Sequence, residues 1–332
     1  MNHINISDTK TLEISKRNVN RKSSRHAYAI IAHNDKACLK TLLELIDDSR
    51  NDVYLLLDKK SSPSLEEGLE CSRSVLHILP YNKRKDIRWG DLSMVEAELA
   101  LFNSIINSQN EYSYIHLLSG QDLPLKTQDE IHDFFKNVPE GSNFLEINDS
   151  EENEKALYEK TNYYHPFTSY LRTNKIDGLS KGKTLFCKII RKISLQFQKA
   201  TGYKRNWGGM KLVKGIQWAS ITPEFAKYLI DRKDFIRKKF KGVLIPDEIY
   251  KQTMAVNSPF DSTILAFSRG NSRGIRLMDW NGSDKIGSPK IYTTQNLEEL
   301  ESAYELFARK FSSAKDPEII DLIRKRLTVL KF

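Results

Sequence analysis

The stretch that decides the fold is AYAIIAHNDKACLKTLLELIDDSRNDVYLLLD, residues 27–58. Its two ends, AYAIIAH and DVYLLLD, are apolar runs typical of buried strands, and a helix with one apolar face is expected between them. The residues at helical spacing are Leu39, Leu42, Leu43 and Ile46. Two strands joined by such a helix are parallel as a rule, and α/β proteins bind ligands at the carboxyl ends of parallel strands. His33 and Asp58, which end these strands, are therefore candidate ligand-binding residues.

The rest of the chain extends this α/β pattern. Further strands are expected at residues 74–80, 112–120 and 215–221. Helices are expected at residues 92–108, 126–138, 223–240, 246–256 and 297–311. Thr127, with Glu130 three residues later, forms a capping-box signature at the start of the second of these helices. Strands that alternate with helices predict an α/β protein with a mostly parallel central sheet.

Composition limits the class of protein. Of the 332 residues 39% are hydrophobic and 29% are charged, which is enough apolar material for a core and too much for general disorder. Cys38, Cys71 and Cys187 lie singly, without the spacing of a disulfide framework or a zinc site, so a reducing compartment is expected. No apolar run is long enough to span a membrane, and the first residues lack the apolar segment of a signal peptide. Neither secretion nor a transmembrane span is expected.

Residues 1–25 are polar and basic without a hydrophobic period, which predicts a flexible arm. Residues 26–332 are expected to form one domain. Within it, a basic helical insertion is predicted around residues 155–206, and further helix is predicted at the C-terminal end. The chain as a whole has a net charge of +9, which suits nucleic acid, an anionic membrane surface or a phosphorylated small molecule equally well.

The positive charge is concentrated in one segment. No acidic residue occurs from Gly178 to Pro223. The helix expected at residues 184–199, TLFCKIIRKISLQFQK, carries Leu185, Ile189 and Ile193 at four-residue spacing. This pattern fits a helix that lies in an anionic membrane interface, and it equally fits a helix that packs on the core with its lysines in solvent. The sequence leaves both interpretations open.

The segment LSGQDLPL, residues 118–125, places Asp122 just after a predicted strand. A carboxylate there reaches a ligand beyond the sheet edge, or else bonds its own turn backbone. The chain contains no D-x-D pair, no H-E-x-x-H, no G-x-G-x-x-G and no Walker lysine loop, and Ser119-Gly120 is not a G-x-S-x-G elbow. Metal, dinucleotide, nucleoside-triphosphatase and serine-nucleophile sites therefore lack support. The residues alone indicate an α/β protein with a basic ligand-binding face.

Several separated segments resemble one known family in the same order. They are AYAIIAHNDKACLKTLLELI, LLLDKKSS, IRWGDLSMVEAELALF, YIHLLSGQDLPLKTQDEIHDFF, KGIQWASIT, IPDEIY and LFARKF. The family is the core-2/I-branching β-1,6-N-acetylglucosaminyltransferases and peptide O-xylosyltransferases, glycosyltransferase family 14, and the resemblance covers residues 26 to 312. It implies a GT-A-like αβα sandwich and an inverting enzyme that takes its sugar from a UDP-sugar without a divalent metal or other cofactor. Fixed cations then stabilise the departing diphosphate.

The resemblance also assigns roles to residues. It places the catalytic base at Glu248, although the residues alone favour an acid that interacts with the dipole at a helix N-terminus. Diphosphate-binding cations are expected at Lys310, with Arg276 slightly preferred over Lys290 as the second. The nucleoside is expected to contact Ile31, Ala32, His33 and Asp58. Gln121, Asp122 and Trp218 are expected near the donor sugar or the acceptor, and Trp89 offers a second flat apolar face.

Animal relatives carry a Golgi membrane anchor and disulfides, which this sequence lacks. It is therefore similar to a bacterial, cytoplasmic member, peripheral on the inner face of the cell membrane. The expected partners are a UDP-sugar, a glycan or lipid-linked glycan acceptor of a bacterial surface polymer, and an anionic membrane surface. Nucleic acid is not expected, because no basic and aromatic platform is present. A non-catalytic sugar-nucleotide- or glycan-binding relative is the alternative function.

Overall fold

A five-stranded sheet forms the centre of the computed structural model, with strand order β3-β2-β1-β4-β8. The strands are β1 (His26–Ala32), β2 (Asn51–Leu57), β3 (Val75–Ile78), β4 (Tyr114–Ser119) and β8 (Ser220–Ile221). The pairs among the first four strands are parallel, and β8 pairs antiparallel with β4. The structure describes residues 24–148, 151–172, 178–265, 268–269, 272–273, 275–280 and 288–329. The strands predicted at residues 27–33 and 52–58 are confirmed within one residue.

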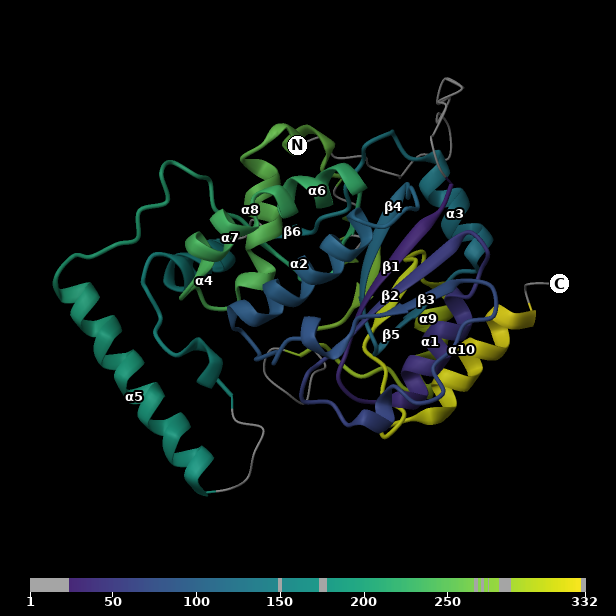
Figure 1. Ribbon diagram of the computed structural model, residues 1–332, viewed down its shortest axis with the longest axis horizontal. Helices are drawn as coiled ribbons and strands as arrows, with labels where there is room; N and C mark the ends of the chain where they lie inside the picture. The colour runs from purple at the N-terminus through teal and green to yellow at the C-terminus, as the bar shows by residue number, and fades with distance from the viewer. Residues whose placement is uncertain are drawn as a thin grey trace.

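Helices cover both faces of this sheet (Figure 1). One face packs against α1 (Lys36–Ile46), α3 (Gln128–Asn137), α9 (Leu297–Ser302) and α10 (Pro317–Val329). The other packs against α2 (Leu92–Ile106), α6 (Pro223–Asp231), α7 (Lys233–Phe240) and α8 (Tyr250–Val256). The helix residues predicted to face the core from α1 are all buried, and the capping box at Thr127 is present. The expected α/β fold with a mainly parallel central sheet is confirmed.

Strands alternate their side chains between two faces, and both faces of this sheet are apolar. Ala27, Ala29 and Ile31 of β1 point into the core on the α2 side, whereas Tyr28 and Ile30 point into the core on the α1 side. A strand buried on both faces has no polar positions to alternate, which is why AYAIIAH reads as a continuous apolar run.

A second, smaller sheet crosses the carboxyl end of β4. Its order is β11 (Arg276–Met278), β12 (Phe307–Arg309) and β5 (Asp122–Pro124), with Arg309 opposite Asp122. The prediction of one helix over residues 297–311 is wrong beyond Ser302, where α9 ends. Residues 307–309 pair with strands on both sides, and these hydrogen bonds outweigh the helical preference of the local sequence. LFARKF is therefore delivered to the sheet end by a strand.

Other boundaries also differ from the predictions. The helix expected at residues 223–240 is divided at Arg232 into α6 and α7, and the one expected at 246–256 begins as the 3₁₀ turn η4 (Pro246–Glu248) before α8. The strand expected at 215–221 is two short ones, β7 (Lys214–Gly215) and β8. The remaining short elements are η1 (Pro63–Leu65), η2 (Tyr81–Lys83), η5 (Pro259–Thr263), β9 (Ser268–Arg269), β10 (Ser272–Arg273) and η6 (Thr294–Asn296).

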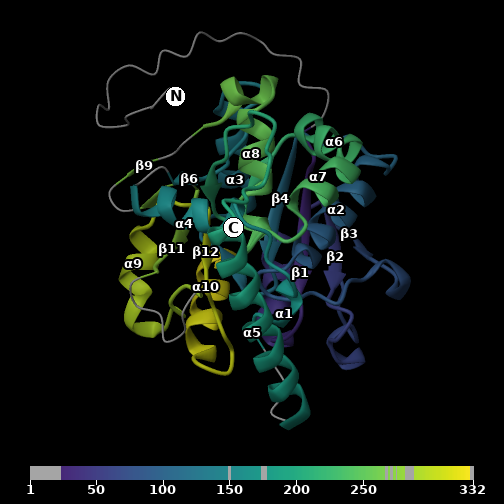
Figure 2. The ribbon, with the colours of Figure 1, turned by 90° about the vertical axis from the view of Figure 1, so that its left-hand side faces the viewer.

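The helical insertion lies between β6 (Ile147–Asn148) and β7, which pair antiparallel. It contains α4 (Glu151–Thr161), the 3₁₀ turn η3 (Thr168–Tyr170) and α5 (Gly178–Ala200). Figure 1 shows α5 at the outer edge of the molecule, far from the central sheet, and in Figure 2 its lower end extends beyond the other helices. Among the described helices, none combines the length and apolar character needed to cross a bilayer.

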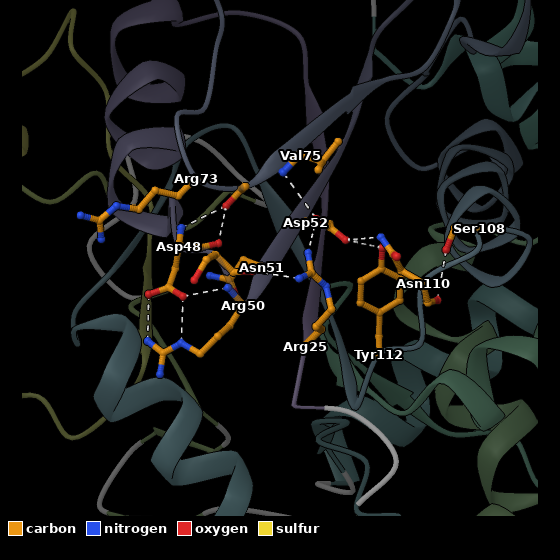
Figure 3. Close-up of polar contacts among 12 residues, drawn as sticks. Arg25, Asp48, Arg50, Asn51, Asp52, Arg73, Val75, Ser108, Asn110 and Tyr112 are labelled. Atoms are coloured by element: carbon orange, nitrogen blue, oxygen red, sulfur yellow. Dashed lines mark hydrogen bonds and ion pairs between the residues drawn. The ribbon is translucent and has the colours of Figure 1, made fainter.

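A polar network secures the amino-terminal end of the sheet (Figure 3). Asp52 is buried there and accepts hydrogen bonds from Arg25 at 2.6 Å, Tyr112 at 2.7 Å and Asn110 at 2.8 Å. Burial disfavours the carboxylate, but the bonds from Tyr112 and Arg25 outweigh it and lower the pKa of Asp52. Arg25, which the sequence assigned to the flexible arm, is thus held at the start of β1. Residues 1–23 of that arm lie outside the described residues.

Candidate active site

The carboxyl ends of β1 and β2 bring His33 and Asp58 together. The Asp58 amide donates to the Ala32 carbonyl at 2.8 Å, so the chain leaves the two strands side by side. The Asp58 carboxylate is buried and bound by the Lys60 ammonium at 2.9 Å, which also contacts Asp86 at 2.5 Å. His33 is exposed. Desolvation, and next the charge of Lys310, lower the pKa of His33 against the opposite effect of Asp58.

The turn after β4 places Gln121 and Asp122 at the same sheet end, and both side chains are buried. The Asp122 carboxylate accepts from the Ser119 amide at 2.9 Å and from the Arg309 guanidinium at 2.6 Å. Burial raises the pKa of Asp122, and Arg309 opposes this rise. With both oxygens engaged by protein groups, Asp122 is placed to fix Arg309 and the turn, rather than to face a sugar directly. The turn-aspartate interpretation of the sequence fits this geometry.

Segment 309–311 crosses this end of the sheet. The Phe311 amide donates to the Gln121 carbonyl at 2.9 Å, and the Gln121 side chain donates back to the Phe311 carbonyl at 3.2 Å. These bonds hold Lys310 close enough to His33 for its charge to affect the imidazole. The Lys310 amide in turn donates to the Lys290 carbonyl at 3.3 Å. The backbone of Lys290 therefore borders that of Lys310, while the Lys290 ammonium lies 3.7 Å from the Asp279 carboxylate.

Arg276 has a different position. Its side chain is buried, and its guanidinium donates to the Ala219 carbonyl at 2.7 Å and to the Ser220 hydroxyl at 3.1 Å. Burial lowers its pKa to about 10. A guanidinium that bridges two parts of the interior is not presented to a diphosphate. This position does not favour Arg276 over Lys290 as the second cation.

Three other expected residues lie within the core. Ile31 and Ala32 are buried in β1, and their carbonyls accept the Gly120 and Asp58 amides. Trp218 is 8% exposed, and the Arg309 guanidinium lies over its ring at 4.4 Å. A ring covered in this way leaves little surface for a pyranose to stack on. Ile31, Ala32 and Trp218 thus belong to the core that supports the strand ends.

Glu248 lies on a separate turn, η4, which starts from a strained backbone. Ile245 has φ 54, in the left-handed region that a β-branched side chain rarely adopts, and its amide donates to the Gly90 carbonyl at 3.0 Å. Such strain costs on the order of 1–3 kcal/mol and is concentrated at functional sites. The Glu248 carboxylate is 22% exposed and lies 3.8 Å from the Lys160 ammonium and 3.6 Å from that of Lys214. This carboxylate is thus accessible and bordered by cations.

The lysines come from either side of the insertion, Lys160 from α4 and Lys214 from β7. Burial, and then the charge of Lys214, lower the pKa of Lys160, while Glu248 raises it. The insertion is held on this turn, because the His165 amide donates to the Gly242 carbonyl at 2.8 Å. Gly242 has φ +73, and a Cβ there would collide with the Tyr164 ring. Trp89 precedes Gly90 beside the same turn, with the Arg172 guanidinium 3.5 Å from its ring centroid.

A buried polar network joins this turn to the strand-end cluster. Glu98 of α2 is fully buried and accepts from Lys251, from the Tyr250 hydroxyl at 2.6 Å and from Gln217 at 3.1 Å. Lys251 also donates to the Asp247 carbonyl at 3.3 Å. Gln217 directly precedes Trp218, which is covered by Arg309. The network therefore connects the turn carrying Glu248, through Gln217 and Trp218, to Arg309 at the end of the sheet.

Asp247 differs sharply from its neighbour Glu248. Its side chain is 7% exposed, and its Oδ1 has no hydrogen-bond partner among the described residues. Burial first, and then the charges of Glu248 and Glu98, raise its pKa to about 8. Asp247 is therefore largely protonated in the folded protein at neutral pH. The two adjacent acids are suited to different roles.

Among the described residues, no three His, Cys, Asp or Glu side chains are grouped so that they could hold a metal ion. A cavity of about 480 Å³ lies near the opposite end of the sheet, between β3 and the end of α2. Its lining includes Tyr54, His77 and Asn110, and Asn110 belongs to the amino-terminal network.

Sequence reasoning missed Arg309, Lys160 and Lys214. Arg309 directly precedes Lys310 in LFARKF. Because a helix was predicted there, the strand alternation that points neighbouring side chains to opposite faces was not expected. Lys160 and Lys214 are 54 residues apart across the insertion, and no spacing rule connects them. The pairing of β6 with β7 positions Lys214, and the hydrogen bond from the Leu244 amide to the Lys160 carbonyl positions Lys160.

Comparison with known proteins agrees with the resemblance. Residues 26–302 match the model of the Core-2/I-Branching enzyme family. The Danio rerio protein named beta-1,3-galactosyl-O-glycosyl-glycoprotein beta-1,6-N-acetylglucosaminyltransferase 4 is 21% identical, over 91% of this chain and 69% of its own length. Xylosyltransferase sqv-6 of Caenorhabditis briggsae is 22% identical, over 85% of this chain but 34% of its own length.

A crystal structure of mouse Xyloside xylosyltransferase 1 in its apo form aligns at a TM-score of 0.35 and 9% identity, over 85% of this chain and 96% of that one. That likeness is too weak to support a structural argument. The family match, by contrast, spans most of the chain and includes His33, Asp58, Asp122, Glu248 and Lys290. The chain therefore belongs to the Core-2/I-branching enzyme family and is a glycosyltransferase.

Proposed function

We propose that the protein is an inverting glycosyltransferase that moves a sugar, with N-acetylglucosamine as first choice, from a UDP-sugar to a hydroxyl group without a divalent metal. The observation that carries the proposal is the pairing of two sites across one buried network. Lys310 lies at the strand ends, close enough to His33 to affect its pKa, and the backbone of Lys290 borders Lys310. The accessible carboxylate of Glu248 lies on a turn that the Glu98 network connects to this end.

On the donor side, Lys310 and Lys290 would bind the diphosphate, since an ammonium donates charge-assisted hydrogen bonds to phosphate oxygens. His33 and Asp58 would contact the uridine from the ends of β1 and β2. Asp122 would act through Arg309, whose guanidinium it orients at 2.6 Å. In this arrangement, fixed cationic side chains of the protein would neutralise the negative charge of UDP.

On the acceptor side, Glu248 would act as the general base. The acceptor oxygen attacks C1 of the sugar from the face opposite UDP, and the bond from C1 to the diphosphate oxygen breaks as the new bond forms. The hydroxyl proton passes to Glu248, and UDP leaves with the bonding electron pair. The configuration at C1 is inverted. A positioned base of this kind contributes roughly 10²–10⁴-fold to the rate.

Metal independence is part of the proposal and rests on the chemistry of the cations. The developing charge on the leaving diphosphate needs preorganised positive groups. Lys310, Lys290 and Arg309 supply such groups at one end of the sheet, and the sequence offers no D-x-D pair to hold a metal there. The role of Lys310 follows from its place beside His33 and from the family resemblance.

For the acceptor we propose a glycan or lipid-linked glycan of a bacterial surface polymer, assembled at the cytoplasmic side of the cell membrane. The named relatives act on glycoproteins or carry xylosyltransferase names, but the acceptor surface here includes a basic insertion whose chemistry suits anionic partners. Trp89 and Arg172, which lie beside the turn of Glu248, are candidates to line the acceptor path.

The proposal is tested by incubating the protein with UDP-N-acetylglucosamine, UDP-xylose, UDP-galactose and UDP-glucose and measuring UDP release with and without simple acceptors. Glu248→Gln should lower kcat by at least about two orders of magnitude while donor affinity stays nearly unchanged, because a base acts in the transition state. Glu224→Gln, an exposed acid in the first turn of α6, is the matched control. Binding of a UDP-sugar without turnover by the unmodified protein would favour the non-catalytic alternative.

A further inference from the structure

The insertion helix α5 exposes a continuous apolar stripe. Leu185, Ile189 and Ile193 recur every four residues with exposed fractions of 60%, 49% and 60%, and Phe186 and Phe197 beside them are exposed by 61% and 68%. Side chains at this spacing lie on one face of a helix. Of the two interpretations that the sequence left open, packing of this face on the core is therefore wrong.

The opposite face of α5 attaches the helix to the protein. Thr184, Cys187 and Gln198 are buried there. The Gln198 side chain accepts from the Tyr164 amide and donates to the Tyr164 carbonyl, both at 2.8 Å. Because these contacts fix the rotation of the helix, the apolar stripe is held outward. It is a surface that the fold presents and not a core face left uncovered by chance.

Cations run along one edge of the stripe. Lys188 and Lys192 directly precede Ile189 and Ile193, and Lys181 lies four residues before Leu185. All three lysines are exposed. Lys199 is engaged differently, since it pairs with Glu159 of α4 at 3.0 Å. No acidic residue occurs from Gly178 to Pro223. Exposed isoleucine, leucine and phenylalanine bordered by lysine on one helix match the composition of interfacial membrane helices.

Charge decides between the two partners that could cover this stripe. A second copy of α5 would bring lysines against lysines with no acid on either helix. Repulsion between these like charges would disfavour a dimer interface, from which water is excluded. An anionic bilayer meets both features at once, because the lysines contact lipid phosphates while the apolar side chains enter the boundary of the acyl region.

We propose that α5 is a membrane-docking helix, in which Leu185, Ile189 and Ile193 enter the interface of an anionic bilayer and Lys188 and Lys192 contact its headgroups. The inference goes beyond the proposed sugar transfer and does not depend on it. Docking would also place the catalytic turn near the membrane. The insertion that carries α5 is bound to that turn through His165 and Gly242, and α4 contributes Lys160 to the surroundings of Glu248.

The test is sedimentation of the full chain with vesicles of phosphatidylglycerol and phosphatidylcholine and with vesicles of phosphatidylcholine alone, at physiological and at high salt. The unmodified protein should sediment with the anionic vesicles, less so at high salt, and not with the neutral ones. Lys188→Glu/Lys192→Glu should weaken this binding at least about tenfold. Lys233→Glu/Lys238→Glu, which changes the charge of α7 equally, should leave it unchanged.

The apolar contribution is tested separately. Ile189→Ser/Ile193→Ser should also weaken vesicle binding, whereas Val329→Ser, at a site 72% exposed on α10, should not. Circular dichroism and thermal unfolding check that each variant folds, and sedimentation velocity without lipid reports on self-association.

Failure of the unmodified protein to bind anionic vesicles would refute the proposal. So would full binding by both α5 variants, or a dimer that dissociates in Ile189→Ser/Ile193→Ser. Sugar transfer to a soluble acceptor should persist in all variants, which separates this inference from the proposed function.

Discussion

Replacement of Asp247 with Asn should change how the stability of the protein depends on pH. Asp247 is buried, its Oδ1 lacks a partner among the described residues, and burial together with Glu248 and Glu98 raises its pKa from 3.8 to about 8. Asparagine has nearly the same shape as a protonated aspartate and cannot ionise. The substitution therefore removes one titration and keeps the packing.

The expected magnitude follows from proton linkage. Between pH 4 and pH 8 the folded protein keeps the Asp247 proton and the unfolded chain has lost it. The free energy of unfolding therefore falls as pH rises, by about 1.4 kcal/mol per pH unit for one such group. From pH 5 to pH 7.5 this amounts to roughly 3 kcal/mol. Below pH 4 both states are protonated and the penalty is absent, and above pH 8 it is fully present.

The assay is urea unfolding of the unmodified protein and of Asp247→Asn at pH 5 and at pH 7.5. The variant should be more stable relative to the unmodified protein at pH 7.5 than at pH 5, by about 3 kcal/mol. Asp133→Asn, an exposed carboxylate on α3, is the control and should show no such difference. An equal effect of Asp247→Asn at the two pH values would refute the idea that this buried acid is neutral in the folded protein.

Three further predictions concern the donor site. Lys310→Ala should weaken UDP and UDP-sugar binding together by roughly 1.5–3 kcal/mol in calorimetric titration, as expected for one lost charge-assisted contact. Lys315→Ala, at a nearby exposed position, should leave this binding unchanged. Unchanged UDP affinity in Lys310→Ala would contradict the role of Lys310. Treatment with EDTA should leave sugar transfer intact, so that loss of transfer restored by Mn²⁺ would show a metal requirement. Arg309→Met should lower the free energy of unfolding by roughly 3–5 kcal/mol because it leaves Asp122 buried and unpaired; Arg309→Met/Asp122→Asn should recover much of this loss, and additive losses in the pair would argue against their coupling.

The central β-α-β unit was predictable because the hydrophobic pattern along the chain determines the structure of its residues. AYAIIAH and DVYLLLD are buried on both faces, and the spacing of Leu39, Leu42 and Leu43 matches a helix that covers one side. His33 and Asp58 follow those strands directly, so their meeting at one sheet end follows from the crossover rule. The sequence is informative wherever a residue's neighbours along the chain also set its environment.

The rest of the site depends on contacts between distant segments. Nothing local distinguishes the buried Arg276 from a cation exposed to a ligand, because its burial results from the carbonyl of Ala219 and the hydroxyl of Ser220. The strand at residues 307–309 forms because β5 and β11 border it, although ELFA reads as helical. The cations beside Glu248 come from separate elements, which only the folded chain brings together.

The short β6–β7 pair has a consequence for how this enzyme can change over time. Asn148 lies opposite Lys214 and Ile147 opposite Gly215, so the insertion leaves and re-enters the fold at one point. A segment with adjacent ends can lengthen, shorten or be exchanged at small entropic cost, and strand register elsewhere is unaffected. Yet its two ends also deliver Lys160 and Lys214 to Glu248. Evolutionary variation in this module would therefore alter the setting of the base and the surface that meets the acceptor in a single step, while the donor site stays constant.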